Sequence, residues 1–189
     1  MRHTLGVLVE NHFGVLARVS GLFGRRGFNI DSLAVGPTED PSVSRITILV
    51  DGDGRVCDQL VHQMNKLVDV ISVRALPAET TVSRELALIK VRADHGNRAQ
   101  IMQIVDVFRG QVVDVSKDAL MVEITGDEAK VGALLDVLGD YGVLEVARTG
   151  TVALSRGAAA MRDGSDAADA EGPPAAPAQA ELAGGDHWA

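Results

Sequence analysis

The spacing of apolar residues predicts the same order of strands and helices in both halves of the sequence. Leu5, Val7 and Val9 alternate with polar or small residues, which is typical of a β-strand. From Leu16 to Phe23 the apolar residues recur at helical spacing. The pattern continues to residue 76 and predicts the order βαββαβ. Strands are expected over residues 5–9, 30–35, 45–50 and 70–76, and helices over residues 16–27 and 56–67.

A second unit of the same order follows. Its strands are expected over residues 86–93, 111–115, 120–125 and 143–147, and its helices over residues 97–108 and 131–138. Right-handed crossovers place both helices of such a unit on one face of its sheet. We therefore expect an α+β protein with two tandem ferredoxin-like βαββαβ domains, over residues 1–77 and 78–157.

The sheet face that carries no helix is expected to hold apolar side chains in both units. By the period of two, Leu8 and Leu49 point to that face in the first unit, and Leu86 and Leu88 in the second. Domains of about 75 residues also bury little core on their own. Pairing of sheet edges between two copies would protect the edges and enlarge the core, so a homodimer is expected.

The end of the chain differs in composition from the rest. Residues 158–189 are rich in Ala, Gly and Pro, carry scattered acidic residues and show no hydrophobic period. Such a segment cannot bury enough apolar surface to fold, and a disordered tail is expected.

Charge, cysteine content and the absence of long apolar runs indicate where the protein is found and what it does not bind. The formal net charge is −8, and the sequence shows no basic stripe of the kind that binds nucleic acid. Its single cysteine, Cys57, allows no intrachain disulfide. The sequence shows neither the layout of a signal peptide nor an apolar run long enough to span a bilayer. These features predict a cytoplasmic protein that binds neither nucleic acid nor membrane.

The sequence offers no catalytic or metal-binding motif. No two of the five histidines share the spacing of a zinc site. Asp58 disfavours a thiolate at the neighbouring Cys57. Residues 51–54 (DGDG) indicate a turn rather than a calcium loop, because the distal glutamate is missing. We expect no catalytic residue, no metal and no cofactor on this chain.

A ligand site is expected in the loop between the first strand and the first helix. Gly14 turns the chain there, and the backbone N–H groups of Gly14, Val15 and Leu16 lie at the positive end of the helix. Such amides bind a carboxylate, and the absence of a Cβ at Gly14 lets a ligand approach. Asn11 places a side-chain amide beside the same point.

Asn29 and Ile30 follow the first helix and could reach the same ligand across an edge interface. A purely structural explanation also stays open. Asn11 would then cap the first helix, and Asn29 would only follow a glycine C-cap at Gly27.

Several stretches carry a resemblance to a known family. They are residues 14–35 (GVLARVSGLFGRRGFNIDSLAV), 41–47 (PSVSRIT), 66–70 (KLVDV), 84–90 (RELALIK), 108–115 (FRGQVVDV) and 145–156 (EVARTGTVALSR). Together they resemble the regulatory (small) subunit of acetohydroxyacid synthase, which is also called acetolactate synthase. GVLARV alone indicates only an ACT domain, a small effector-binding fold, whereas RRGFNIDSL and FRGQ narrow the resemblance to this family. It covers about residues 1–157.

The resemblance implies an N-terminal ACT domain, a C-terminal ACT-like domain, and a valine site where two ACT domains meet. Some members of the family bind leucine or isoleucine instead. The implied effector contacts are the side chains of Asn11 and Asn29, the amides of Gly14, Val15 and Leu16, and the backbone of Ile30. Phe13 departs from the family pattern, in which a smaller residue or proline precedes the glycine. The amides remain able to bind a carboxylate, and the departure is expected to bear on the loop shape and so on the effector preference.

The resemblance also implies a partner protein. That partner is the catalytic large subunit, which condenses pyruvate with pyruvate or 2-oxobutyrate and carries thiamine diphosphate, Mg²⁺ and FAD. The chain itself would then be no enzyme. It would activate the large subunit and confer feedback inhibition by valine in branched-chain amino acid biosynthesis.

Two other functions are compatible with the order of elements. A free-standing ACT-domain sensor would bind the same amino acids but act on another enzyme or a transcription factor. An RNA-binding module can share the βαββαβ order, but it stacks bases on sheet aromatics. Aromatic residues make up only 3% of this chain, which disfavours the RNA-binding function.

Overall fold

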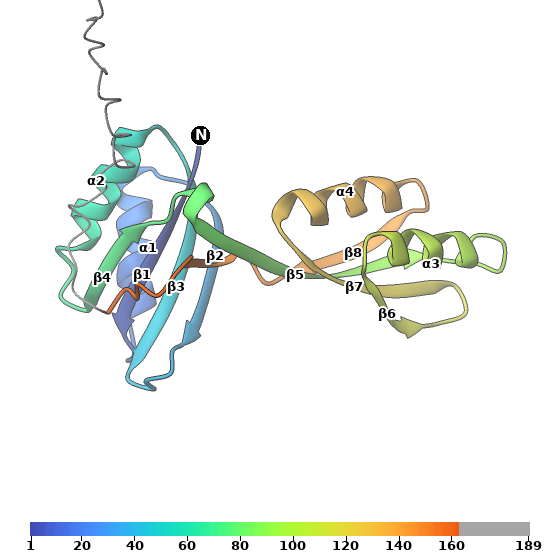
Figure 1. The fold of residues 1–189 in the computed structure, drawn as a ribbon, viewed down its shortest axis with the longest axis horizontal. Helices are drawn as coiled ribbons and strands as arrows, with labels where there is room; N and C mark the ends of the chain where they lie inside the picture. Colours follow the sequence, from blue (N-terminus) through green and yellow to red (C-terminus); the bar gives the residue numbers. More distant parts are fainter. Residues whose placement is uncertain (163–189) are drawn as a thin grey trace, which may run out of the picture.

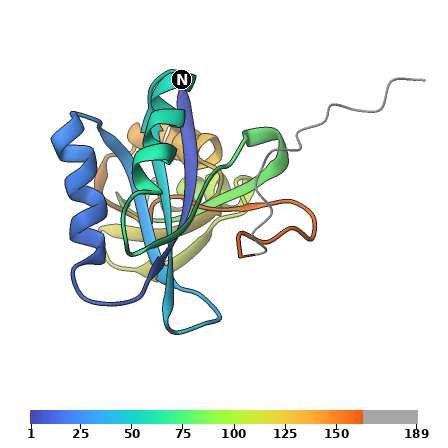
Figure 2. The ribbon, with the colours of Figure 1, turned by 90° about the vertical axis from the view of Figure 1, so that its left-hand side faces the viewer.

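The computed structural model of the protein describes residues 1–162 and shows two α+β domains joined by one long strand (Figure 1). The first domain contains β1 (Arg2–Glu10), α1 (Val15–Arg26), β2 (Ile30–Pro37), β3 (Val43–Asp51), α2 (Gly54–Met64) and β4 (Val70–Ala75). Its strands form an antiparallel sheet in the order β2-β3-β1-β4. Both helices lie on the same face of that sheet (Figure 2).

The core of the first domain lies between the sheet and its two helices. α1 contributes Val15, Val19, Leu22 and Phe23, which are spaced by three or four residues and therefore share one face of the helix. Gly27 ends α1 in the left-handed conformation, with φ of 72°, and turns the chain toward β2.

The second domain repeats the order of the first. It contains β5 (Thr81–Arg92), α3 (Arg98–Val107), β6 (Gln111–Val115), β7 (Ala119–Gly126), α4 (Glu128–Gly139) and β8 (Val143–Arg148), after the short 3-10 helix η1 (Ala78–Thr80) and before β9 (Val152–Ser155). Its sheet has the order β6-β7-β5-β8. The predicted pair of ferredoxin-like units is confirmed. No helix among residues 1–162 is long and apolar enough to cross a membrane.

β5 is longer than predicted, and its two ends pair with different strands. From Glu85 onward it pairs with β7 inside the second sheet. Residues 81–84 instead pair with β9, from Thr81 opposite Ser155 to Arg84 opposite Val152. The sequence predicts neither of these short pieces, because four residues are too few for a period of two to be recognised.

The chain after β8 returns to the first domain, and we call residues 149–162 the C-terminal strap (orange in Figure 1). The backbone N–H of Thr151 donates to Ser32 Oγ of β2 at 2.9 Å. Arg45 Nη2 of β3 donates to the carbonyl oxygen of Ala153 at 2.8 Å. The strap therefore lies against the face of the first sheet that carries no helix.

Part of the expected disordered tail belongs to this strap. Met161 is 8% exposed and packs against Leu8 and Val43. The composition of residues 158–162 predicts disorder, but these residues are ordered. Met161 alone supplies a buried apolar contact, which the small residues around it cannot make. The remainder of the expected tail, residues 163–189, lies outside the described residues.

The strap ends on the turn between β2 and β3. Arg162 forms ion pairs with Glu39, at 3.1 Å, and with Asp40, at 3.5 Å. It also donates to Thr38 Oγ1 at 3.1 Å. A polar clamp therefore fixes the last described residue to this turn.

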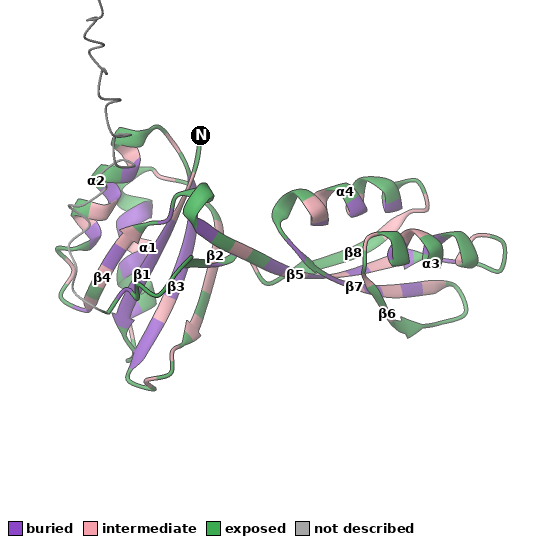
Figure 3. Cartoon of the chain, in the orientation of Figure 1, coloured by how far each residue is buried: buried purple, intermediate pink, exposed green. Residues whose placement is uncertain are grey.

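The four leucines assigned to the open sheet faces lie as predicted. Leu8 and Leu49 are buried on the strap side of the first sheet. Leu86 and Leu88 are half-buried, and they alternate with core residues that face α3 and α4. Figure 3 shows that no helix of the described chain covers the lower face of the second sheet.

The burial of Met161 predicts a measurable contribution to stability. Met161→Ala removes the side chain that covers Leu8, and the free energy of unfolding should fall by about 2 kcal/mol. Met102→Ala, at a helical position that is 44% exposed, is the matched control and should change it by less than about 0.5 kcal/mol. Urea unfolding of the full chain measures the free energy of unfolding of both variants. An equal decrease in the two would contradict the packing of Met161 against Leu8.

Candidate functional site

The loop between β1 and α1 leaves the start of α1 without a side-chain cap. Gly14 is the N-cap residue, with φ of 90° in the left-handed region, and no side chain accepts a hydrogen bond from the first amides. α2, by contrast, is capped by Asp53, which accepts from the amide of Val56 at 2.9 Å. A Cβ on Gly14 would meet nothing within 4 Å, so the backbone there is open to approach. The amides of Val15 and Leu16 follow at the positive end of the helix.

Asn11 lies beside this helix start but does not cap it. Its Nδ2 donates to the carbonyl oxygen of Pro41 at 2.8 Å, and its backbone N–H donates to that of Ser42 at 2.7 Å. The alternative in which Asn11 caps α1 is therefore wrong. Asn11 is instead held by the turn that precedes β3.

Asn29 and Ile30 lie at the other end of α1. The C-cap at Gly27 is present, and Asn29 Nδ2 donates to Asp31 Oδ1 at 3.0 Å. α1 has 12 residues, so its ends lie about 18 Å apart. A single chain therefore brings Asn11, Gly14, Val15 and Leu16 together, but it does not bring Asn29 and Ile30 to them.

Asn29 and Ile30 line a cleft between the two domains, with a volume of about 600 Å³. The cleft is mainly polar. Glu85, which is 4% exposed, is paired with Arg148, whose Nε lies 3.2 Å from Glu85 Oε2. Across the cleft, Arg2 forms an ion pair with Glu128, the first residue of α4.

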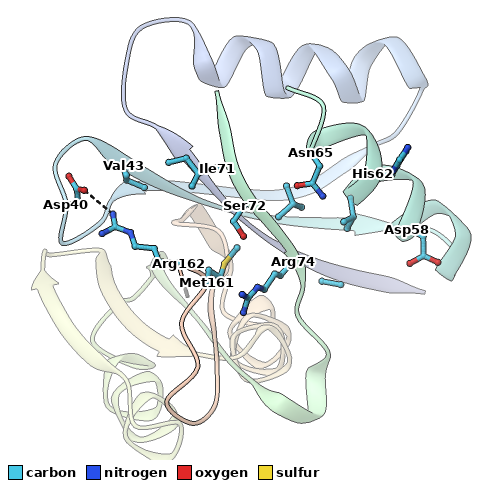
Figure 4. Close-up of a pocket in the computed structure, with 13 residues that line it drawn as sticks. Asp40, Val43, Asp58, His62, Asn65, Ile71, Ser72, Arg74, Met161 and Arg162 are labelled. Atoms are coloured by element: carbon cyan, nitrogen blue, oxygen red, sulfur yellow. Dashed lines mark ion pairs between the residues drawn. The ribbon is translucent and has the colours of Figure 1, made fainter. Parts of the chain in front are cut away.

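A larger cavity of about 960 Å³ lies along β4 and α2 (Figure 4). Ile71, Asn65 and Met161 are among its lining residues, and the ion pair between Arg162 and Asp40 lies at its rim. None of the six predicted site residues lines this cavity. Size alone therefore does not identify the site.

A charged cluster that the sequence does not predict lies next to the α1 loop. His12 Nε2 is 3.2 Å from Glu10 Oε2 and 3.2 Å from Asp69 Oδ1, and Arg18 pairs with the other oxygen of Asp69. A hydrogen bond with the carbonyl oxygen of Phe13 raises the pKa of His12, and Asp69 and Glu10 raise it further. The spacing of Glu10 and His12 is visible in the sequence, but the approach of Asp69 depends on the fold.

Cys57 is buried in the core of the first domain and is 4% exposed. Burial raises the pKa of its thiol, and the charge of Asp58 raises it further. A thiol in this setting is a poor nucleophile.

Two family models match the chain, one over each domain. Residues 5–72 match the AHAS (acetohydroxyacid synthase) small subunit-like ACT domain, and residues 84–157 match the model described as the small subunit of acetolactate synthase. The chain belongs to the acetolactate synthase small-subunit family. The matched residues include the α1 loop, Asn29 and the first part of the strap.

Relatives in this family align over most of their own length. A probable acetolactate synthase small subunit of Archaeoglobus fulgidus is 52% identical over 83% of this chain and 98% of its own. An acetolactate synthase small subunit of Mycobacterium bovis is 54% identical over 82% of this chain and 92% of its own. The crystal structure of an acetolactate synthase small subunit from Thermotoga maritima has a TM-score of 0.79 at 43% identity, over 84% of this chain and 99% of that one.

The backbone of Gly14 predicts a difference between two glycine substitutions near α1. Gly14→Ala should lower the free energy of unfolding by about 1–2 kcal/mol, because an L-residue is strained at φ of 90°. Gly24→Ala, inside the exposed face of α1, has open space around it and should raise that free energy by about 0.5–1 kcal/mol. Chemical denaturation measures both. Equal stability of the two variants would show that the loop is free to adopt another conformation.

Proposed function

We propose that this chain is the regulatory subunit of acetolactate synthase in the cytoplasm, which activates a catalytic large subunit and makes it sensitive to valine. The chain contributes no catalytic group, and thiamine diphosphate, Mg²⁺ and FAD belong to the large subunit. Membership in the small-subunit family supports the partner. The uncapped start of α1 beside Asn11 is the observation that carries the sensing role.

The predicted site residues lie in two groups at opposite ends of α1, one around Asn11 and Gly14 and the other at Asn29 and Ile30. This separation favours a site shared by two chains. β2 is an edge strand of the first sheet, and α1 runs directly into it. Pairing β2 with its copy about a two-fold axis sets the two α1 helices antiparallel, so the start of one helix lies near the end of the other. Asn11 of one chain then approaches Asn29 of its partner.

Exposed apolar side chains of α1, of the loop before it and of β2 support such a dimer. Phe13 is fully exposed, and Leu16 and Val35 are 44% and 47% exposed. A second copy would cover these side chains and would close the edge of the sheet.

An amino acid fits the polar groups that this dimer would gather. Its carboxylate would accept hydrogen bonds from the amides of Val15 and Leu16. Its ammonium group would donate to the side-chain oxygens of Asn11 and of the partner's Asn29. Charge-assisted hydrogen bonds contribute about 1.5–3 kcal/mol each, and after the cost of immobilisation micromolar to millimolar affinity follows. The aliphatic side chain of valine would lie against Leu16.

Asn29 also provides a route from the effector to the second domain. Asn29 donates a hydrogen bond to Asp31 of the same chain, and Asp31 Oδ2 lies 3.7 Å from Arg2 Nε. Arg2 in turn forms an ion pair with Glu128 of α4. A change at Asn29 would therefore act on the polar cleft between the domains. A full switch from 1:99 to 99:1 needs about 5.5 kcal/mol of differential affinity, which two effectors per dimer supply more readily than one.

Chain mixing tests whether the site is shared. Asn11→Ala and Asn29→Ala are each expected to weaken valine binding by about tenfold or more, because a charge-assisted hydrogen bond is lost. A heterodimer that combines the two variants, isolated with two different tags, holds one intact site and one doubly altered site. Calorimetry should then find one valine per heterodimer at wild-type affinity. Asn65→Ala, at the exposed C-cap of α2, is the matched control.

Failure of the heterodimer to regain a site would show that each site lies within one chain. Normal valine binding by Asn11→Ala would remove Asn11 from the site. Either outcome leaves the family assignment unchanged.

Reconstitution tests the regulatory role. Purified large subunit should form acetolactate about fivefold faster or more when this chain is added, and valine should reverse most of that gain. The Asn65→Ala chain should act as the wild type does. An unchanged rate, with or without valine, would instead favour a free-standing sensor that acts on another protein.

A further inference from the structure

Three side chains converge beside the α1 loop in a geometry that suits a metal ion. Glu10 ends β1, His12 lies in the loop, and Asp69 immediately precedes β4. One oxygen of each carboxylate and the Nε2 of His12 lie within 4.8 Å of one another. Glu10 and His12 are two residues apart, but Asp69 lies far from them in the sequence, so the fold completes the cluster.

The orientation of the imidazole supports this assignment. His12 Nδ1 lies 3.1 Å from the carbonyl oxygen of Phe13, which can only accept, so Nδ1 carries a proton. Nε2 faces the two carboxylates, and either its own proton or a metal ion can lie between them. Histidines that bind metals typically donate their other ring N–H to a carbonyl in this way.

The distances between the three candidate ligand atoms match those between ligands of one metal ion. Nε2 is 3.2 Å from Glu10 Oε2 and 3.2 Å from Asp69 Oδ1. Two ligands at about 2.0–2.1 Å from a tetrahedral zinc ion lie about 3.3 Å apart. Asp69 is buried, and Arg18 holds its second oxygen and so fixes the direction of the first. Glu10 and His12 are about half exposed, which leaves room for entry and for water ligands.

We propose that Glu10, His12 and Asp69 form a binding site for one divalent transition-metal ion, with Zn²⁺ as the reference ion. One imidazole and two carboxylates suit zinc and its neighbours better than Mg²⁺, which prefers oxygen ligands alone. The ion would tie the end of β1, the α1 loop and the start of β4 together. The proposal does not depend on valine binding, although the loop it stabilises is the one that carries Gly14.

Calorimetric titration of ZnCl₂ into the metal-free full chain tests the site, at mildly alkaline pH where protons compete little for the imidazole. One ion per chain is expected. His12→Gln and Glu10→Gln should each weaken its binding by about tenfold or more, whereas His95→Gln, at an exposed histidine of the second domain, should leave it unchanged. Far-ultraviolet circular dichroism establishes that the variants are folded.

A second measurement uses thermal stability. Zn²⁺ should raise the melting temperature of the wild type and of His95→Gln but not that of His12→Gln, because a ligand that binds only the folded state stabilises it. Equal Zn²⁺ affinity in wild type and His12→Gln would overturn the proposal. Mg²⁺ binding as tight as that of Zn²⁺ would overturn the assignment of the metal class. Neither result would bear on the valine site, which is measured without metal.

Discussion

Each of the two sheets of this protein carries its helices on one face only, and the apolar side chains of the other face need a cover. In the first domain the cover comes from the far end of the chain, through Ala153 and Met161 of the C-terminal strap. The start of β5 pairs with β9 in the same strap, and the rest of β5 pairs inside the second sheet. The two domains are therefore linked by the hydrogen bonds of the strap with Ser32 and Arg45 as well as by chain connection, and the orientation of one constrains the other.

The length of α1 has a comparable consequence for ligand binding. Asn11 and Asn29 lie at opposite ends of a 12-residue helix, too far apart to contact one small molecule in the same chain. In the proposed dimer, a two-fold axis beside the helix would remove that separation without any change of fold, because it would set the end of one helix beside the start of its copy. A dimer of the proposed kind would couple ligand binding to the arrangement of its subunits.

Local pattern was sufficient to predict the order of the elements, the faces of Leu8 and Leu88, and the glycines that flank α1, because each depends on residues close in sequence. It was not sufficient for β9 or for Met161, since these acquire their partners from distant parts of the sequence. The hydrogen bond of Asn11 with Pro41, and the approach of Asp69 to His12, have the same origin. An asparagine before a helix suggests a cap unless the position of a distant turn is known.

The turn between β2 and β3 holds two partners at once. Pro41 and Ser42 accept hydrogen bonds from Asn11, and Glu39 and Asp40 form ion pairs with Arg162. The same short turn thus holds both the loop between β1 and α1 and the last described residue of the strap. A displacement of this turn would therefore move Asn11 and Arg162 together.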